Sequence, residues 1–297
     1  MKKILLVICI LSMGSLAWAQ SAPSLGSSAS FAVLGTTTVT NATTPPGPPA
    51  FTTITGDLGL APPGVSVTGF SLVPGVNRIV VGPSPATGVT AGLGVVTGTI
   101  HVGDAVALLA HADATKTYAA LLAETCGTNL SGSDLGGLTL TPGVYCFDSS
   151  AQLTGTLTLS GNGVYVFQIG STLTTATGSS VVLTNGALCG NVFWQVGSSS
   201  TLGLGTSFAG NLIAFTSDTV TTGVSVAGRV FALGGAVTLD TNNITAGACA
   251  SNGGGGGGHD HDGCKNGDGD HDKDKDKDHH DKDKDKDKDH HDEDHKS

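Results

Sequence analysis

Threonine recurs at regular intervals in the second half of the chain, each time inside a short alternation of polar and apolar residues. Consecutive repeats are 27, 18 and 19 residues apart. Steps of this size accommodate about three short strands and are typical of β-solenoid coils, each of which stacks on its neighbours. We therefore predict a mainly β protein with a parallel β-solenoid. The repeats align on Thr174 in VFQIGSTLTTATGSSV, Thr201 in FWQVGSSSTLGLGTSF, Thr219 in IAFTSDTVTTGVSV and Thr238 in FALGGAVTLDTNN.

Strand alternation separates the buried side of each repeat from the exposed side, because successive side chains of a strand point to opposite faces. The position after each of these threonines is mostly apolar, as in Leu202 and Val220, and is assigned to the core. The positions two before and two after share the outward facing and carry small side chains such as Ser217 and Thr221. The alternation thus predicts a flat face of small, mostly hydroxylated residues.

Two further stretches extend the predicted face, namely LTGTLTL with Thr154 and Thr156, and FAVLGTTTVTN with Thr38 and Thr40. The second stretch matches FALGGAVTLDT (231–241) without gaps, so that Thr38 corresponds to Thr238. We therefore expect the first strand to lie beside the last coil, where it would cover a sheet edge against strand addition by another molecule. Residues 42–99 are rich in Pro, Gly and Val, and the alternation assigns them no strand register.

One segment departs from the β pattern and predicts a single helix. Residues from about 104 to 124 are rich in alanine and leucine, contain no proline, and begin with Asp104 as a plausible N-cap. We expect this helix to pack along one side of the solenoid through an apolar stripe at approximate helical spacing, formed by Leu108, Ala112, Tyr118 and Leu122.

The two ends of the chain differ from the region between them. The N-terminus has two lysines, an apolar run and a small-x-small cleavage site that ends at Ala19, which is typical of a secretory signal peptide. We therefore expect a secreted, extracellular protein, and no later stretch is apolar enough to cross a bilayer. The predicted segments are a signal peptide (1–19), a solenoid domain (20–250), a glycine-rich linker (251–258) and a disordered tail (259–297).

Charge is concentrated in the tail. From Ser251 onward the chain has sixteen acids and nine bases, a net −7 of the total −10, whereas residues 20–250 have eight acids and three bases. A domain with so few bases cannot neutralise phosphates, which excludes nucleic acid as its partner. We expect the tail to be a solvated tether; the alternative is loose divalent metal binding through His259, His261, His279, His280, His290 and His291.

The cysteines of an exported chain meet oxidising conditions, where pairing is the default. Cys126 and Cys146 are close in sequence, and a bond between them would stabilise the fold by about 3 kcal/mol in the chain-entropy model. A second bond between Cys189 and Cys249 would fasten the end of the domain, which leaves Cys264 over. No C-x-x-C spacing supports a metal site instead.

Several long motifs, in order along the chain, resemble the microbial ice-binding protein family: GDLGLAPPG, GTIHVGDAVA, TNLSGSDLGGLTLTPGVYCF, SSAQLTGTLTL, FQIGSTLTTATGSSVVL and NVFWQVGSSSTLG. The resemblance covers residues from about 25 to 245. It implies a right-handed β-solenoid of triangular cross-section, one long helix alongside, and first strands that are out of sequential order in the stack. The departures are a longer region at 70–97, Leu204 and Asp240 next to the predicted face, and the charged tail.

The resemblance implies that the protein adsorbs to ice, with the ice surface and its ordered water as partners. We expect the protein to need no cofactor and to be a monomer. A polysaccharide lyase or hydrolase would need clustered carboxylates, but the acids of the domain are scattered singly. A secreted adhesin that binds glycan or cell surfaces remains the alternative. The candidate ice-binding residues are Thr38, Thr40, Thr154, Thr156, Thr172, Thr174, Ser199, Thr201, Ser217, Thr219, Thr221 and Thr238.

Overall fold

The computed structural model describes residues 21–42, 51–63, 66–82 and 88–247. The predicted signal peptide, the linker, the tail with its histidines, and Cys249 and Cys264 lie outside the described residues. Within the described ranges, none of the helices combines the length and the apolar character needed to span a bilayer. Because residues 1–19 lie outside the described residues, their removal on export stays a prediction.

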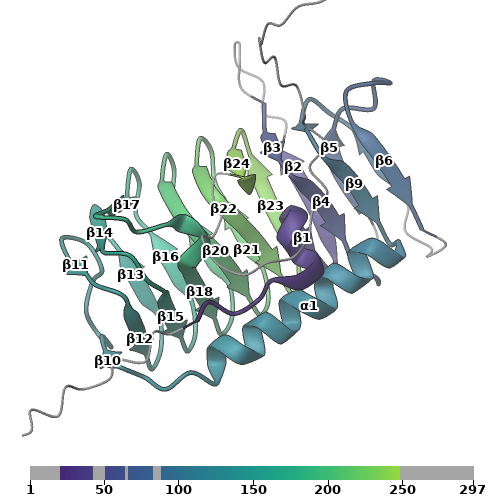
Figure 1. Ribbon diagram of the computed structural model, residues 1–297. Helices are drawn as coiled ribbons and strands as arrows, with labels where there is room; N and C mark the ends of the chain where they lie inside the picture. Colours follow the sequence, from purple (N-terminus) through teal and green to yellow (C-terminus); the bar gives the residue numbers. More distant parts are fainter. Residues whose placement is uncertain (1–20, 43–50, 64–65, 83–87, 248–297) are drawn as a thin grey trace, which may run out of the picture. The chain divides into compact units, whose positions relative to one another are not determined.

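The described residues form a mainly β solenoid in which every strand pair is parallel. Each coil contributes one strand to each of three sides, as in β15 (Tyr165–Ile169), β16 (Leu173–Thr175) and β17 (Ser180–Thr184). The next coil stacks directly on these strands with β18 (Val192–Val196), β19 (Ser200–Leu202) and the first part of β20 (Ser207–Ala214). Figure 1 shows the coils side by side, with the helix along one side.

The strands are grouped here by the side on which they lie. The helix-covered side contains, in spatial order, β10 (Thr128–Asn129), β12 (Gly143–Phe147), β15, β18, the second halves of β20 and β22 (Ser225–Ala232), β1 (Phe31–Gly35), β4 (Asp57–Leu60), β9 (Thr99–Val102) and β6 (Arg78–Val81). The second side contains β13 (Ala151–Leu153), β16, β19, β21 (Asp218–Val220), β23 (Val237–Asp240), β2 (Thr38–Ala42), β5 (Ser66–Phe70) and β7 (Val89–Ala91). The third side, named here the second flat face, contains β11 (Thr139–Leu140), β14 (Thr156–Ser160), β17, the first halves of β20 and β22, β24 (Asn243–Thr245), β3 (Thr53–Thr55) and β8 (Val95–Val96).

The first strands are out of sequential order in the stack, as expected. β1 lies between β22 and β4, and β2 lies between β23 and β5, so the N-terminal coil is inserted between the last coil and the coils that follow it in sequence. The predicted register was wrong by two residues, because Thr40 rather than Thr38 pairs with Thr238. A shift of two residues keeps every side chain on its own face, so alternation alone could not detect it.

The predicted helix is confirmed as α1 (Ala105–Leu122), and its expected N-cap is confirmed as well. The Asp104 side chain accepts a hydrogen bond from the backbone N–H of Ala107 at 2.8 Å. Of the predicted apolar stripe, only Tyr118 is confirmed as buried, and the prediction was wrong for Leu108 and Leu122, which are exposed. Small alanines let the helix approach the sheet closely, and the residues that are buried are Ala107, Ala110, Ala114, Thr117, Tyr118 and Leu121.

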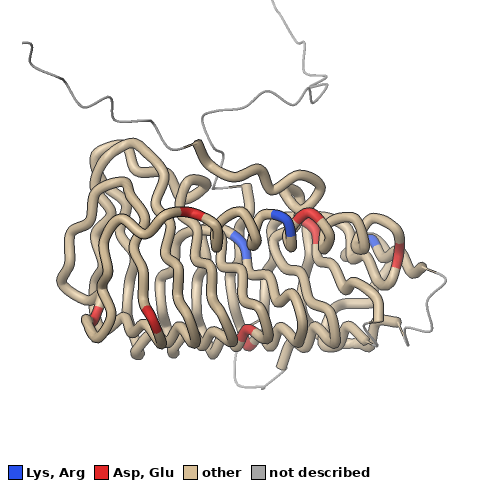
Figure 2. The backbone as a smooth tube through the Cα atoms, turned by 90° about the horizontal axis from the view of Figure 1, so that it is seen from below, with Lys and Arg blue, Asp and Glu red and all other residues tan. Residues whose placement is uncertain are grey.

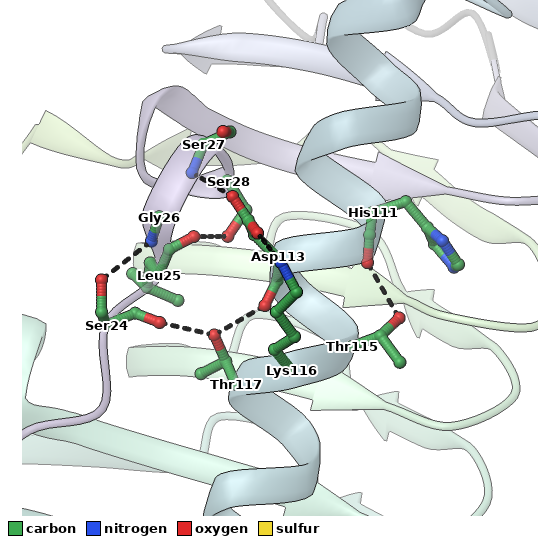
Figure 3. Close-up of polar contacts among 10 residues, drawn as sticks. All are labelled: Ser24, Leu25, Gly26, Ser27, Ser28, His111, Asp113, Thr115, Lys116 and Thr117. Atoms are coloured by element: carbon green, nitrogen blue, oxygen red, sulfur yellow. Dashed lines mark hydrogen bonds and ion pairs between the residues drawn. The ribbon is translucent and has the colours of Figure 1, made fainter.

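The N-terminal segment before β1 is hydrogen-bonded to this helix (Figure 3). The backbone N–H of Ser27 donates to Oδ2 of Asp113 at 2.8 Å, and the Thr117 hydroxyl donates to the Ser24 carbonyl at 2.8 Å. Lys116 donates to the other carboxylate oxygen of Asp113 at 2.8 Å. The hydrogen bonds from Lys116 and Ser27 lower the pKa of Asp113 to about 2. The segment thus lies beside the helix, and it also contacts the sheet, because Arg229 of β22 donates to the Ala29 carbonyl.

The core continues through the whole solenoid and contains a row of stacked rings. Phe167 and Trp194 lie on adjacent coils with ring centroids 3.9 Å apart, and Tyr145 stacks on Phe167 from the other side at 5.5 Å. The predicted disulfide between Cys126 and Cys146 is confirmed, with a Cα–Cα distance of 5.9 Å. It ties the chain that follows α1 to β12.

Cys189 is buried in the short 3-10 turn η2 (Cys189–Asn191) that precedes β18, and it too is disulfide-bonded. Its expected partner, Cys249, lies outside the described residues, so this second pairing stays a prediction.

Candidate functional site

Threonines occupy one outward position on seven consecutive strands of the second side. The pairing registers place them in the spatial order Thr174, Thr201, Thr219, Thr238, Thr40, Thr68 and Thr90. We name this set the threonine column. Because adjacent strands lie about 4.8 Å apart, the column repeats the same hydroxyl and methyl pair at that interval. The structure therefore brings together four predicted column threonines and Thr40.

A second column of small side chains runs parallel to it, two residues earlier in each strand, and is named here the flanking column. Its members are Thr172, Ser199, Ser217, Ala236, Thr38 and Ser66. Alternate residues of a strand are about 6.6 Å apart, which fixes the distance between the two columns. The two columns together are the threonine face, and none of their residues carries a charge.

Buried residues on the inner side hold this face flat. Leu202, Val220 and Leu239, which follow the column threonines, are at most 1% exposed and confirm the predicted core positions. Threonine is stiff at χ1, because two heavy atoms on its Cβ restrict rotation. Because their χ1 is already restricted, the outward threonine side chains lose little conformational entropy when a ligand orders them.

Three predicted site residues lie outside the threonine face. Thr156 is on β14 of the second flat face, where its hydroxyl lies 2.9 Å from that of Ser180. The chain turns between the two faces at Gly155, whose φ of 86° suits glycine. Thr154 lies at this turn, and Thr221 follows β21 and donates its hydroxyl to the Leu202 carbonyl at 2.7 Å. Alternation gives the facing of a residue but not the place where the chain turns a corner.

The sequence analysis missed three residues of the threonine face. Thr68, Thr90 and Ser66 lie on β5 and β7, in the region to which it assigned no register. The signal was present as Val-Thr pairs in SVTGF and GVTAG, each of which repeats the buried and outward order of Val39 and Thr40. The intervening glycines and prolines obscured the repeat.

Two acids, Asp218 and Asp240, lie on strands of the threonine face but have different positions. Asp218 is on the inner side of β21, 1% exposed, and accepts a hydrogen bond from the Ser200 hydroxyl. Its other oxygen, Oδ2, has no hydrogen-bond partner, and burial raises the pKa of this carboxyl to about 8. Asp240 ends β23 at the border of the face and accepts from the Thr222 hydroxyl at 2.5 Å. Leu204, which like Asp240 departs from the family pattern, is exposed in the turn that follows β19.

Charged residues are sparse over the part of the solenoid that the structure describes. Figure 2 shows them thinly spread among uncharged residues, and Lys116 is paired with Asp113. Over residues 21–42, 51–63, 66–82 and 88–247, no group of three or more His, Cys, Asp or Glu side chains could hold a metal ion.

Comparison with known proteins gives consistent matches. A family model described as ice-binding-like matches residues 33–245. The ice-binding protein of Nostoc sp. (strain HG1) is 47% identical over 247 residues, which are 82% of this chain and 81% of that protein. Ice-binding protein 1 of Shewanella frigidimarina is 45% identical over 118 residues, so that this chain matches only 13% of its length.

A solved structure of an ice-binding protein from the Antarctic ascomycete Antarctomyces psychrotrophicus has a TM-score of 0.63 and 37% identity, over 76% of this chain and 98% of that one. The family model covers more than half of the chain, and it covers the whole threonine face. The fold and the family match therefore agree. This chain belongs to the ice-binding-like family.

Proposed function

We propose that this protein binds ice through the threonine face and thereby inhibits ice growth or recrystallisation. The observation that carries the proposal is the threonine column, in which seven consecutive strands repeat one hydroxyl and one methyl group. The names of the relatives support the same function.

The physical basis is the ordering of water over a rigid lattice. Spacings of about 4.8 Å along each column and about 6.6 Å between the two columns hold the hydroxyls in two dimensions on the scale of the oxygen repeats in ice. The hydroxyls hydrogen-bond to surface water, and the methyl groups between them leave that water no strong competing partner. Charged side chains would orient water strongly, and the face has none.

We further propose that the protein acts outside the cell. The N-terminal sequence pattern supports export. The disulfide between Cys126 and Cys146 is of the kind that persists in an oxidising compartment. Sequencing the N-terminus of the protein recovered from the culture medium would test this, with cleavage after Ala19 expected.

Substitution in the middle of the column tests the proposed face. In Thr219→Tyr, the larger side chain stands above the plane and separates ice from its neighbours, so adsorption should fall at least about tenfold (about 1.4 kcal/mol). Because Thr219 points outward, the fold should persist. Ice-affinity partition and freezing hysteresis measure the effect, and circular dichroism checks the fold.

Thr158→Tyr is the matched control, because Thr158 is an outward threonine on β14 of the second flat face. It should leave partition and hysteresis unchanged. If the control variant loses adsorption and Thr219→Tyr retains it, the second flat face is the ice-binding surface. If neither wild type nor variants shape ice crystals, the function itself is refuted.

A further inference from the structure

A hollow lies at the corner where the helix-covered side meets the side of the threonine face. Its volume is about 400 Å³, and it is bordered by the C-terminal half of α1 and by the ends of β12, β15 and β18 (Figure 1). None of the described residues that line it belongs to the threonine face. The proposed ice-binding surface therefore leaves this hollow without a role.

Two glycines open the hollow between larger side chains. On four consecutive coils, the residue directly after the strand of the helix-covered side lies at this corner, and the four strands are in register. In spatial order these corner residues are Asp148, Gly170, Gly197 and Phe215. A Cβ on Gly197 would lie 2.5 Å from the Gly170 carbonyl oxygen, so the stacking of the coils fixes the gap. Three strand spacings, about 14 Å, separate the carboxylate position from the aromatic one.

An apolar rim lies on the aromatic side of the hollow. Tyr118 and Leu122 line the hollow from α1, one helical turn apart, and Leu122 is exposed. Phe215 is 58% exposed, and its ring centroid lies 6.0 Å from that of Tyr118. The fold thus leaves a large aromatic ring and a leucine side by side in water, and contiguous exposed apolar groups of this kind mark binding surfaces.

Side-chain amides form the polar floor of the hollow. Gln168 and Gln195 are register partners on β15 and β18, and Gln195 is buried. Nε2 of Gln168 donates to the Leu121 carbonyl at 2.7 Å and to the Glu124 carbonyl at 2.8 Å. Because these bonds use both of its N–H groups, Gln168 offers a ligand its Oε1 as an acceptor. The same two bonds hold that oxygen in place before a ligand arrives.

A carboxylate and a third amide lie on the side opposite Phe215. Nδ2 of Asn129 lies 3.4 Å from both carboxylate oxygens of Asp148, and both side chains are exposed. The backbone N–H of Asp148 donates to the Ser131 hydroxyl at 2.8 Å, which holds the chain at this point. A carboxylate has about four acceptor positions, so Asp148 retains capacity for hydrogen bonds from a ligand.

The lining residues determine which chemistry fits the hollow. Among the residues that the structure describes, no lysine, arginine or histidine lines it, so nothing there would neutralise a phosphate or a carboxylate ligand. The oxygen acceptors of Gln168, Gln195 and Asp148 suit hydroxyl donors. The ring of Phe215 suits an apolar C–H face. A neutral hexose has many hydroxyls around its edge and C–H groups on its faces, and it therefore meets both requirements.

We propose that this hollow binds a neutral saccharide through a hexose unit, either free or within a glycan, with its C–H face against Phe215 and its hydroxyls on Gln168, Gln195 and Asp148. The hollow and the threonine face share no residue. A molecule held by a glycan therefore keeps its threonine face open to ice. The saccharide site goes beyond the proposed function and does not depend on it.

Affinity electrophoresis tests the binding. The whole protein is run in native gels that contain a neutral glucan, galactan or mannan, and at least one of the three should retard it. Free glucose, galactose or mannose is then added to the retarding gel. Restored mobility would show that a single hexose fills the hollow, and unchanged retardation would show that the site needs a longer glycan. Normal mobility in all three gels, or retardation only by an anionic polysaccharide, would overturn the proposal.

Two exposed residues of the site can be replaced with little risk to the fold. Phe215→Ala removes the ring and should raise the dissociation constant at least about fivefold. Asp148→Ala removes the carboxylate and should raise it about tenfold. Leu204→Ala is the matched control, because Leu204 is exposed at another corner and lies outside the hollow. Circular dichroism checks the fold of each variant.

Ice-affinity partition of the same variants separates this site from the proposed function. Phe215→Ala should partition into ice like wild type, because Phe215 follows β20 outside the threonine face. Thr219→Tyr should be retarded by the polysaccharide like wild type. Retardation of a protein that does not bind ice would refute only the proposed function. Wild-type retardation of both Phe215→Ala and Asp148→Ala would refute only the saccharide site.

Discussion

Asp218 lies directly beneath the threonine face, with its side chain turned into the core. Its register partners on the adjacent strands are Ser200 and Val237, neither of which carries a charge. Only one of its carboxyl oxygens is hydrogen-bonded, to the Ser200 hydroxyl. Burial therefore favours the neutral acid, and this residue couples the stability of β21 to pH.

The stability of the fold should decrease with rising pH because of this one group. The folded pKa of Asp218 is about 8 and its unfolded value is 3.8, so between these values the folded state binds more protons. The contribution is fully present below about pH 4 and is lost as pH rises through about 8, with a slope of at most about 1.4 kcal/mol per pH unit. Asp218→Asn should remove this slope, so its free energy of unfolding should rise relative to wild type from pH 5 to pH 9.

Denaturant unfolding at pH 5, 7 and 9 measures that difference. Asp148→Asn serves as the control, because Asp148 is exposed on the surface and its replacement should follow the wild-type curve. Parallel curves for wild type and Asp218→Asn would show that Asp218 titrates equally in both states.

Individual residues of the candidate site could be predicted where the repeat has no gaps. The column from Thr174 to Thr238 follows from alternation, because each threonine precedes a core position and its facing is thereby determined. Asp218 could not be placed in this way, since an acid at an inward position contradicts the pattern that alternation relies on. Only the tertiary packing shows that it is buried.

At the scale of elements, the helix depends on its N-cap. Asp104 accepts from the Ala107 N–H, and its other oxygen lies 2.6 Å from Nδ1 of His101. Asp104→Ala leaves helix N–H groups without a partner and should lower the free energy of unfolding by about 1–2 kcal/mol. Asp104→Asn retains the oxygen acceptor and should lose less than half of that. Urea unfolding compares the two; equal losses would mean that the cap bond adds nothing.

The bends of β20 and β22 depend on glycine. A Cβ on Gly228 would lie 1.9 Å from the Gly210 carbonyl oxygen, a backbone atom that cannot move aside. Gly228→Ala should therefore destabilise the protein by more than about 3 kcal/mol or prevent folding. Gly223→Ala also places alanine at a positive φ of 72°, but it meets open space and should cost about 1 kcal/mol. The melting temperatures of the two variants measure this difference. Similar values would show that the close contact of residue 228 with the Gly210 carbonyl does not limit stability.

The elements themselves were largely predictable, whereas their arrangement was less so. The alanine and leucine content, together with Asp104, predicted the helix. Its buried side, however, consists mainly of alanines such as Ala110 and Ala114 rather than of the larger leucines. Packing against a flat sheet favours small side chains at the contact. The facing of β2 was predicted and its register was not, because a slide of two residues preserves facing.

At the scale of the whole solenoid, the strand order could not be derived from periodicity. The N-terminal coil lies between the last coil and the coil of β4 and β5, and only the likeness of residues 31–41 to 231–241 indicated the contact with the last coil. The pairing of β5 and β7, which lengthens the threonine column by Thr68 and Thr90, was not predicted at all. The contact of β2 with β23 joins segments distant in sequence, whereas the Val-Thr pairs of β5 and β7 were obscured by the glycines and prolines between them.

The inserted coil has a consequence for the synthesis of the protein. Thr40 lies between Thr238 on one side and Thr68 on the other, so the earliest part of the chain occupies the middle of the surface and the latest part completes it. A ribosome that stops before Val237 releases a polypeptide whose two groups of threonines have no common sheet. An uninterrupted array of seven threonines thus requires synthesis of the chain through β23.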